Sequence, residues 1–102
     1  MEIRNFTTDI DKFLDHLEET TRSKVSKVLY LLEMVGNEIE MPYSKSLGGG
    51  LFELRISGKI SIRIIYCFHQ NYAILLNAFI KKSDKIPKKE LDLAKRRREA
   101  IL

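Results

Sequence analysis

Three consecutive segments between residues 51 and 80 alternate between apolar and other side chains, and this pattern limits the possible folds more than any other feature of the sequence. The segments span about 51–57, 60–68 and 72–80, and only the short polar stretches SGK and HQN separate them. A period of two is typical of β-strands, and loops this short join antiparallel neighbours. The second half of the chain therefore predicts three strands of an antiparallel sheet.

A short strand and a helix are predicted at the start of the chain. Residues 2–6 (EIRNF) alternate as a strand does. Apolar side chains then recur at the helical spacing i, i+3, i+4 and i+7 between Ile10 and Leu17. Thr8 is the predicted N-cap of this helix, and Asp11, three residues later, completes a capping box.

Two further helices are predicted, one before the strands and one after them. Apolar residues keep the helical period over 25–35, so a second helix is predicted to start near residues 20–23 and to end at Gly36. Residues 37–50 contain a proline and three glycines and are predicted to form a loop. Pro87 suits the first turn of a last helix.

These elements predict an α+β fold in a single domain of residues 1–102. A strand and a helical hairpin from the N-terminus pack on one face of a twisted antiparallel sheet, and a helix follows at the C-terminus. The 44% of hydrophobic residues are enough for one core. The one cysteine, Cys67, excludes an internal disulfide and favours a reducing cytoplasm. No signal-peptide core and no apolar run of about 20 residues is found, so no membrane contact is expected.

The charge is unevenly distributed along the chain. Residues 1–44 hold 5 Lys and Arg against 9 Asp and Glu, whereas residues 45–102 hold 13 against 5. The first part therefore carries −4 and the second +8, in agreement with the net charge of +4. A strongly basic half suggests a polyanionic partner, although a basic run alone is usually only a solvated surface.

Alternation along the strands gathers the strand charges on one face of the sheet. Matching the apolar faces predicts the pairs Ile56–Ile60, Leu54–Ile62, Tyr66–Ile74 and Ile64–Leu76. The other face then carries two cross-strand rows, the first of Glu53, Arg63 and Asn77, the second of Arg55, Ser61 and Phe79, with Lys81 one step further. A Glu53–Arg63 ion pair on a solvated face is one interpretation, but an exposed pair is worth less than ~1 kcal/mol. Two arginines and a lysine around a ring instead suit a phosphate and a stacked base.

The motifs LFELR, G-x-x-x-x-RIIY and ILLNAFIKKSDKIPKKELDLAKRR resemble the phage-derived HigB-like branch of the RelE/ParE toxin superfamily. The resemblance covers nearly the whole chain. It implies the toxin of a type II toxin–antitoxin pair, with a helix-turn-helix antitoxin encoded beside it. Many such toxins enter the ribosomal A site and cut mRNA there. The family fold, two helices on a twisted antiparallel sheet with the active face opposite, agrees with the predicted elements.

The resemblance also indicates site residues. The catalytic candidates are Arg55, Arg63 and Lys81. The RNA-binding candidates are Phe79, Lys82, Lys45 and Lys85. Lys82 alternates away from Lys81 if the strand continues. Some relatives use a C-terminal tyrosine or histidines for proton transfer, but no tyrosine follows Tyr72, and His16 and His69 are expected to be structural.

Cleavage through the RNA 2′-OH needs a base, stabilisation of the phosphorane and protonation of the 5′-oxygen. Arg55 and Arg63 suit the stabilising role, because guanidinium groups match phosphate oxygens. Lys81, crowded by other cations, is the candidate general base. No cofactor is expected, and no residue spacing predicts a metal site. The alternatives are a ParE-like inhibitor of DNA gyrase that is not an enzyme, and a nucleic-acid-binding module without catalysis.

Overall fold

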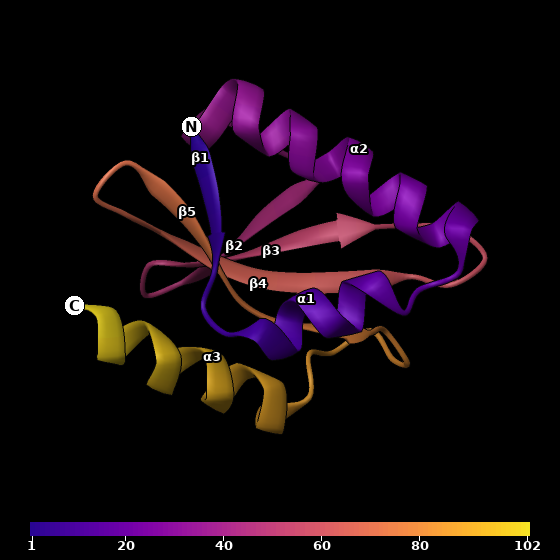
Figure 1. Ribbon diagram of the computed structural model, residues 1–102. Coiled ribbons are helices and arrows are strands. Elements are labelled where there is room, and N and C mark those ends of the chain that lie inside the picture. Colours follow the sequence, from indigo (N-terminus) through magenta and orange to yellow (C-terminus); the bar gives the residue numbers. More distant parts are fainter.

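The computed structural model describes residues 1–102 as one sheet with helices on both faces (Figure 1). The elements in chain order are β1 (Glu2–Asn5), α1 (Thr8–Asp15), α2 (Glu19–Val35), the 3-10 helix η1 (Gly36–Glu38), β2 (Ser44–Gly48), β3 (Leu51–Ile56), β4 (Ile62–His69), β5 (Tyr72–Ile80) and α3 (Lys88–Ile101). The predicted α+β class is confirmed. None of the helices combines the length and apolar composition needed to cross a bilayer.

The sheet has the strand order β1-β5-β4-β3-β2. Strands β3 to β5 are antiparallel neighbours, as predicted, the unpredicted strand β2 is antiparallel to β3, and β1 runs parallel to β5. The sheet is therefore mixed rather than purely antiparallel. The parallel pair is possible because α1, α2 and three strands separate β1 from β5 in the chain, and parallel neighbours need such a long connection.

The sheet buries apolar side chains on both faces. Helices α1 and α2 cover one face, and α3 covers part of the other (Figure 1). The first core includes Ile10, Val25, Leu32, Leu54, Ile64, Tyr66 and Leu75. The second core consists of Leu51, Ile65, Cys67, Leu76, Phe79 and Ala94. The sequence predicted only the first of these cores.

The predicted register of β3 and β4 is wrong by two residues. Ile56 pairs with Ile62, not with Ile60, and Leu54 pairs with Ile64. The connecting loop therefore spans residues 57–61, and Ile60 is an exposed loop residue. A shift of two residues keeps every side chain on its predicted face, because the side-chain period of a strand is two.

The hairpin between β4 and β5 has a two-residue turn in place of the predicted three-residue loop. Gln70 and Asn71 both have positive φ, 48° and 68°. Positive φ at both central residues is typical of the type I′ turn, which matches the twist of the flanking strands. His69, predicted to lie in the turn, is consequently the last residue of β4 and pairs with Tyr72.

The two-residue turn reverses the predicted faces in the first part of β5, and a β-bulge restores them further along the strand. Tyr66 pairs with Leu75, while its neighbour Ile65 pairs with Asn77, so Leu76 is the extra residue. Leu75 therefore lies in the first core, and Leu76 lies in the second. The predicted pair Tyr66–Ile74 is wrong because the shorter turn shifts the pairing by one residue, and Ile64–Leu76 is wrong because the bulge adds a second residue to that shift, so that Ile64 pairs with Ala78. Beyond the bulge the predicted faces hold.

Two local predictions also need correction. Residues 37–50 are not only a loop, because they include η1 and the edge strand β2. The N-cap of α1 is Thr7 rather than Thr8, without a side-chain capping bond, and Asp11 instead accepts a hydrogen bond from Asn5. Gly36 ends α2 with a φ of 57°, as predicted from the sequence.

Candidate anion-binding site

Two arginines lie directly opposite each other on neighbouring strands. Arg55 of β3 pairs with Arg63 of β4, and Arg63 pairs with Phe79 of β5. The register shift therefore replaces both predicted rows. The observed rows are Arg55–Arg63–Phe79 and Glu53–Ile65–Asn77. Like charges directly opposite each other destabilise a sheet, so this row calls for a compensating group.

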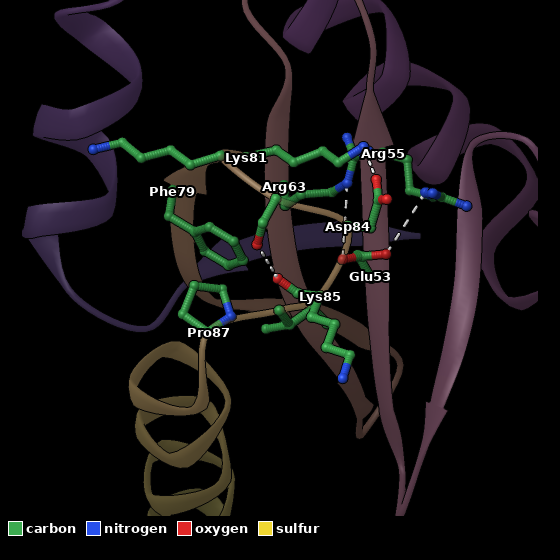
Figure 2. A pocket seen from close by; sticks show the side chains of 11 residues that line it. Glu53, Arg55, Arg63, Phe79, Lys81, Asp84, Lys85 and Pro87 are labelled. Atoms are coloured by element: carbon green, nitrogen blue, oxygen red, sulfur yellow. Dashed lines mark hydrogen bonds and ion pairs between the residues drawn. The ribbon is translucent and has the colours of Figure 1, made fainter.

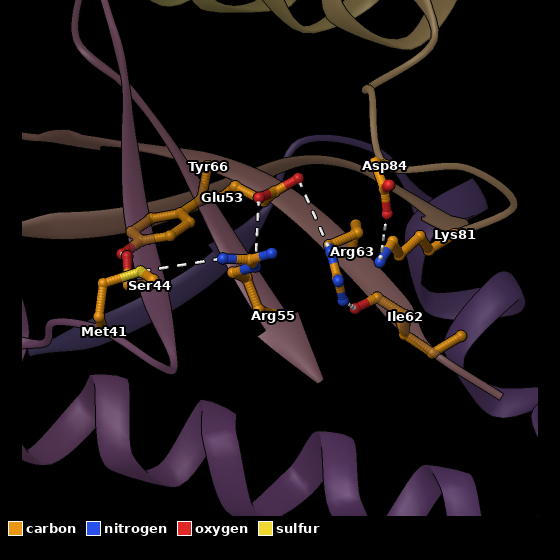
Figure 3. Close-up of polar contacts among 9 residues, drawn as sticks. All are labelled: Met41, Ser44, Glu53, Arg55, Ile62, Arg63, Tyr66, Lys81 and Asp84. Carbon is orange, nitrogen blue, oxygen red and sulfur yellow. Dashed lines mark hydrogen bonds and ion pairs between the residues drawn. The ribbon is translucent and has the colours of Figure 1, made fainter. Parts of the chain in front are cut away.

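Glu53 supplies part of that compensation by contacting both arginines. Its Oε1 lies 3.7 Å from Nε of Arg55, and its Oε2 lies 3.8 Å from Nε of Arg63 (Figure 3). Glu53 is 6% exposed and Arg63 is 5% exposed. The predicted Glu53–Arg63 pair thus exists, but it is buried, and one carboxylate serves two guanidinium groups. The three side chains together carry a net positive charge.

Burial makes the charge of Arg63 unfavourable for folding. Its Nη1 donates a hydrogen bond to the Ile62 carbonyl oxygen at 3.1 Å. Burial lowers the pKa of Arg63 below its ordinary value, Glu53 opposes this effect, and Arg55 adds to it. A lowered pKa means that the fold disfavours the charged guanidinium, which therefore costs folding free energy at neutral pH. Charged side chains are seldom buried to this extent without partners, and Glu53 and the Ile62 carbonyl oxygen are the partners of Arg63 here.

A small pocket opens in front of this row (Figure 2). Its lining residues are Glu53, Arg55, Arg63, Phe79, Lys81, Lys82, Ser83, Asp84, Lys85, Ile86 and Pro87. Five of these are cationic and two are anionic, for a net charge of +3. The cavity volume is about 20 Å³, enough for a water molecule or the oxygen of an anion. The pocket is suited to hold one negatively charged group.

The segment after β5 forms the second wall of the pocket. Strand β5 ends at Ile80, and the backbone N–H of Lys81 donates to the Ser61 carbonyl oxygen at 2.9 Å. Because the strand has ended, Lys81 and Lys82 both line the pocket, and the alternation expected for Lys82 does not apply. Nζ of Lys81 lies 3.6 Å from Oδ1 of the exposed Asp84.

The structure brings together most of the predicted site residues. The six that line the pocket are Arg55, Arg63, Phe79, Lys81, Lys82 and Lys85. Lys45 is the exception, since it lies exposed on β2 opposite Glu53 and does not line the pocket. Asp84 was not predicted as a site residue. The sequence could have indicated it, because Asp84 stands between the lysines of the basic segment.

The two histidines lie outside the pocket, and no three metal-ligating side chains cluster in the structure. Nδ1 of His16 lies 2.6 Å from the Lys12 carbonyl oxygen, where the residue caps the C-terminus of α1. Proton transfer through either histidine finds no support in this geometry.

Helix α3 is fixed to the sheet by two polar contacts. Nη1 of Arg97 donates to the Leu76 carbonyl oxygen at 2.7 Å, and this side chain also contacts Asp9 and the Phe6 ring. Nδ2 of Asn77 donates to the carbonyl oxygen of Glu90, at 3.2 Å, and to its Oε1, at 3.0 Å. The contact of Asn77 with Glu90 holds the start of α3, next to Pro87 at the wall of the pocket, and the contacts of Arg97 hold the later part of the helix. Arg97 is therefore a structural residue within the basic run of α3.

Comparison with known protein families identifies a match over most of the chain. The model of a protein family described as "Phage derived protein Gp49-like (DUF891)" matches residues 12–99 of the chain. The matched range includes α2, strands β2 to β5, all residues of the pocket and most of α3. No curated protein matches the chain.

Proposed function

The chain belongs to the phage-derived Gp49-like family, which is RelE-like and toxin-like, and on that premise we propose that it is the toxin of a type II toxin–antitoxin pair, of the HigB-like branch. It cuts mRNA on the ribosome in the cytoplasm as a metal-independent endoribonuclease. A helix-turn-helix antitoxin is its expected partner.

The observation that carries this proposal is the pair of adjacent arginines with a single carboxylate between them. Buried charge of one sign costs folding free energy, and groups kept at such a cost are often functional. Guanidinium groups match the oxygens of a phosphate in geometry and in charge. The net charge of +3 around the pocket supports an anionic substrate.

The proposed reaction is attack of a ribose 2′-oxygen on the neighbouring phosphate, with departure of the 5′-oxygen. Arg55 and Arg63 stabilise the extra negative charge of the phosphorane, and preorganised electrostatic stabilisation is usually the largest contribution to catalysis. Glu53 holds the two guanidinium groups in place. Phe79, next to Arg63 in the row, offers its ring to a base. Lys81, at the pocket wall, is the proposed general base.

Mapping mRNA 5′ ends after brief induction in a bacterial host tests this proposal. The wild-type chain should create new ends inside reading frames, and a block of translation initiation should remove them. Arg55→Gln should abolish the new ends. Arg4→Gln, a matched change of an exposed arginine on the edge strand β1, should leave them unchanged.

Other outcomes would point to other functions. Growth arrest without new ends, retained in Arg55→Gln, would favour a ParE-like gyrase inhibitor, which needs no phosphate site. Neither arrest nor new ends, with RNA binding that depends on Arg55, would favour a nucleic-acid-binding module. New ends that persist under the initiation block would reject ribosome dependence but retain the nuclease.

A further inference from the structure

The arginine pocket is too small for a nucleotide. Its volume of about 20 Å³ admits an oxygen of the reacting phosphate, whereas sites for whole small molecules measure about 300–1,000 Å³. The riboses and bases on either side of that phosphate must therefore lie in neighbouring hollows. Two such hollows share residues with the pocket, and both are large enough.

One of these, which we call the flanking hollow, has a volume of about 430 Å³. It lies between the β3–β4 loop and the segment after β5. Its lining residues are Lys59, Ile60, Ser61, Ile80, Lys81, Lys82, Ser83 and Asp84. The last four also line the arginine pocket, so a single strand of RNA can pass from one to the other without leaving the surface.

The flanking hollow offers an apolar surface for a base and cationic side chains for a phosphate. Ile60 and Ile80 are 37% and 40% exposed, although large aliphatic side chains are usually buried. The bond from the Lys81 N–H to the Ser61 carbonyl oxygen ties their two segments together. Apolar side chains of this kind contact the face of a base. Lys59 and Lys82 supply cations for its phosphate.

The charge of the other neighbouring hollow makes it a poorer path. That hollow, about 440 Å³ in volume, is lined by one lysine and one glutamate together with Phe13, Ala78, Phe79, Ile80 and Pro87. The flanking hollow has three lysines and one aspartate, and this aspartate is paired with Lys81. The net positive charge of the flanking hollow attracts a phosphodiester chain, whereas the other hollow has no net charge to attract it.

We propose that the flanking hollow binds the nucleotide next to the cleaved phosphate, with Ile60 and Ile80 against its base and Lys59 and Lys82 near its phosphate. This inference rests on the proposed function and adds a path for the substrate. The β3–β4 loop then influences which base is accepted at this position, because Ile60 contacts the base from that loop.

A short RNA that cannot be cut tests this proposal by binding alone. The probe is a fluorescent 2′-O-methyl trinucleotide, together with two versions that each lack one terminal base, and binding is followed by anisotropy over a range of salt concentrations. The protein variants are Lys59→Gln and Ile60→Ser, with Lys27→Gln on α2 as a matched control, because Lys24 of the same helix lies against Gly58 of the β3–β4 loop. All three residues are exposed, or nearly so, and their replacement should leave the fold intact.

Removal of one terminal base should weaken binding to the wild-type chain by about fivefold. That loss should become smaller in Ile60→Ser, because one of the two side chains that contact the base is already gone and only Ile80 remains. Lys59→Gln should weaken binding and reduce the slope of log K against log salt by about 0.7, the value for one phosphate contact on a single strand. Lys27→Gln should behave as the wild type does.

The inference is overturned if Lys59→Gln changes binding no more than Lys27→Gln does, or if loss of the base has the same effect in Ile60→Ser as in the wild type. Arg63→Met separates this failure from failure of the proposed function. If Arg63→Met weakens binding and Lys59→Gln does not, only the flanking hollow is rejected. If neither change matters, or if the probe does not bind, both the flanking hollow and the arginine pocket are rejected as RNA-binding sites of the free protein, and the mapping of mRNA 5′ ends decides the proposed function separately.

Discussion

The second face of the sheet has two halves that differ in what covers them. In the half under α3, the covered half, strand residues such as Leu51, Ile65 and Leu76 pack against Ala94 of the helix. In the other half, the charged half, Glu53 and Arg63 are buried to a similar extent but face the pocket. The same strands thus provide an apolar core at one end and a cationic site at the other.

The two halves make opposite contributions to folding. Apolar area removed from water in the covered half stabilises the fold by about 25 cal/mol per Å². In the charged half, burial lowers the pKa of Arg63, a direction that shows a cost to folding. Mutations in the two halves should therefore affect stability and activity separately, and the following experiments test this comparison.

Arg63→Met should have the largest effect, and on activity alone. Loss of one group that stabilises the transition state lowers the rate of cleavage by about 10²–10³-fold. Glu53 keeps Arg55 as a partner, so the melting temperature should equal or exceed that of the wild type. Counting mRNA 5′ ends together with thermal unfolding checks both parts. A marked fall in melting temperature would show that the charged half also stabilises the fold.

Leu76→Ala should have the opposite effect, with a loss of stability and no loss of cleavage. Leu76 is fully buried in the covered half, so its truncation should lower the free energy of unfolding by about 3 kcal/mol. Denaturant unfolding measures this change. Cleavage per folded molecule should stay at the wild-type level, because Leu76 does not line the pocket. Loss of cleavage in fully folded protein would mean that the two halves are coupled.

Arg97→Gln should have a smaller effect on the covered half. The change removes the donor to the buried Leu76 carbonyl, and such a loss costs about 1–3 kcal/mol. Arg96→Gln, a change of the exposed neighbour in the same helix, should shift the free energy of unfolding by less than about 0.5 kcal/mol. Equal effects of the two changes would show that Arg97 does not fix α3 to the sheet.

Alkaline pH should produce the smallest effect, again in the covered half. Burial raises the pKa of the Cys67 thiol above its ordinary value of 9.0, although the charge of Arg98 opposes this. A raised pKa favours the neutral thiol in the fold. Its stabilisation is full below pH 9.0 and is lost as the pH rises through the folded pKa. The free energy of unfolding should thus fall less steeply above pH 9 in Cys67→Ala, and equal slopes would contradict this.

Much of this architecture follows from sequence patterns alone. The period of two placed Arg55, Arg63 and Phe79 on one face, and that result survived a register error of two residues because the period is unchanged by such a shift. The helices were predicted for a similar reason, since Gly36 and Pro87 mark their limits by local backbone preference.

The rest depends on contacts between distant segments. The bulge at Leu76 and the five-residue loop at 57–61 are set by how strands fit together, and neither has a clear local signature. The sequence did indicate that something covers part of the second face of the sheet, as α3 does. Ile65 and Cys67 are apolar residues on that face, which was predicted to be charged. The structural role of Arg97 had none, because its neighbours Arg96 and Arg98 look identical in the sequence.

The parallel pairing of β1 with β5 has a consequence for the order in which the protein is made. Residues 2–5 leave the ribosome first, yet their only neighbours in the sheet are residues 72–75. Residues 79–87, which complete the pocket, are made later still. A growing chain therefore has no finished site until most of its length has been synthesised, and the first strand gains its sheet partner only at the same late stage, through contacts between distant segments that form slowly compared with local ones.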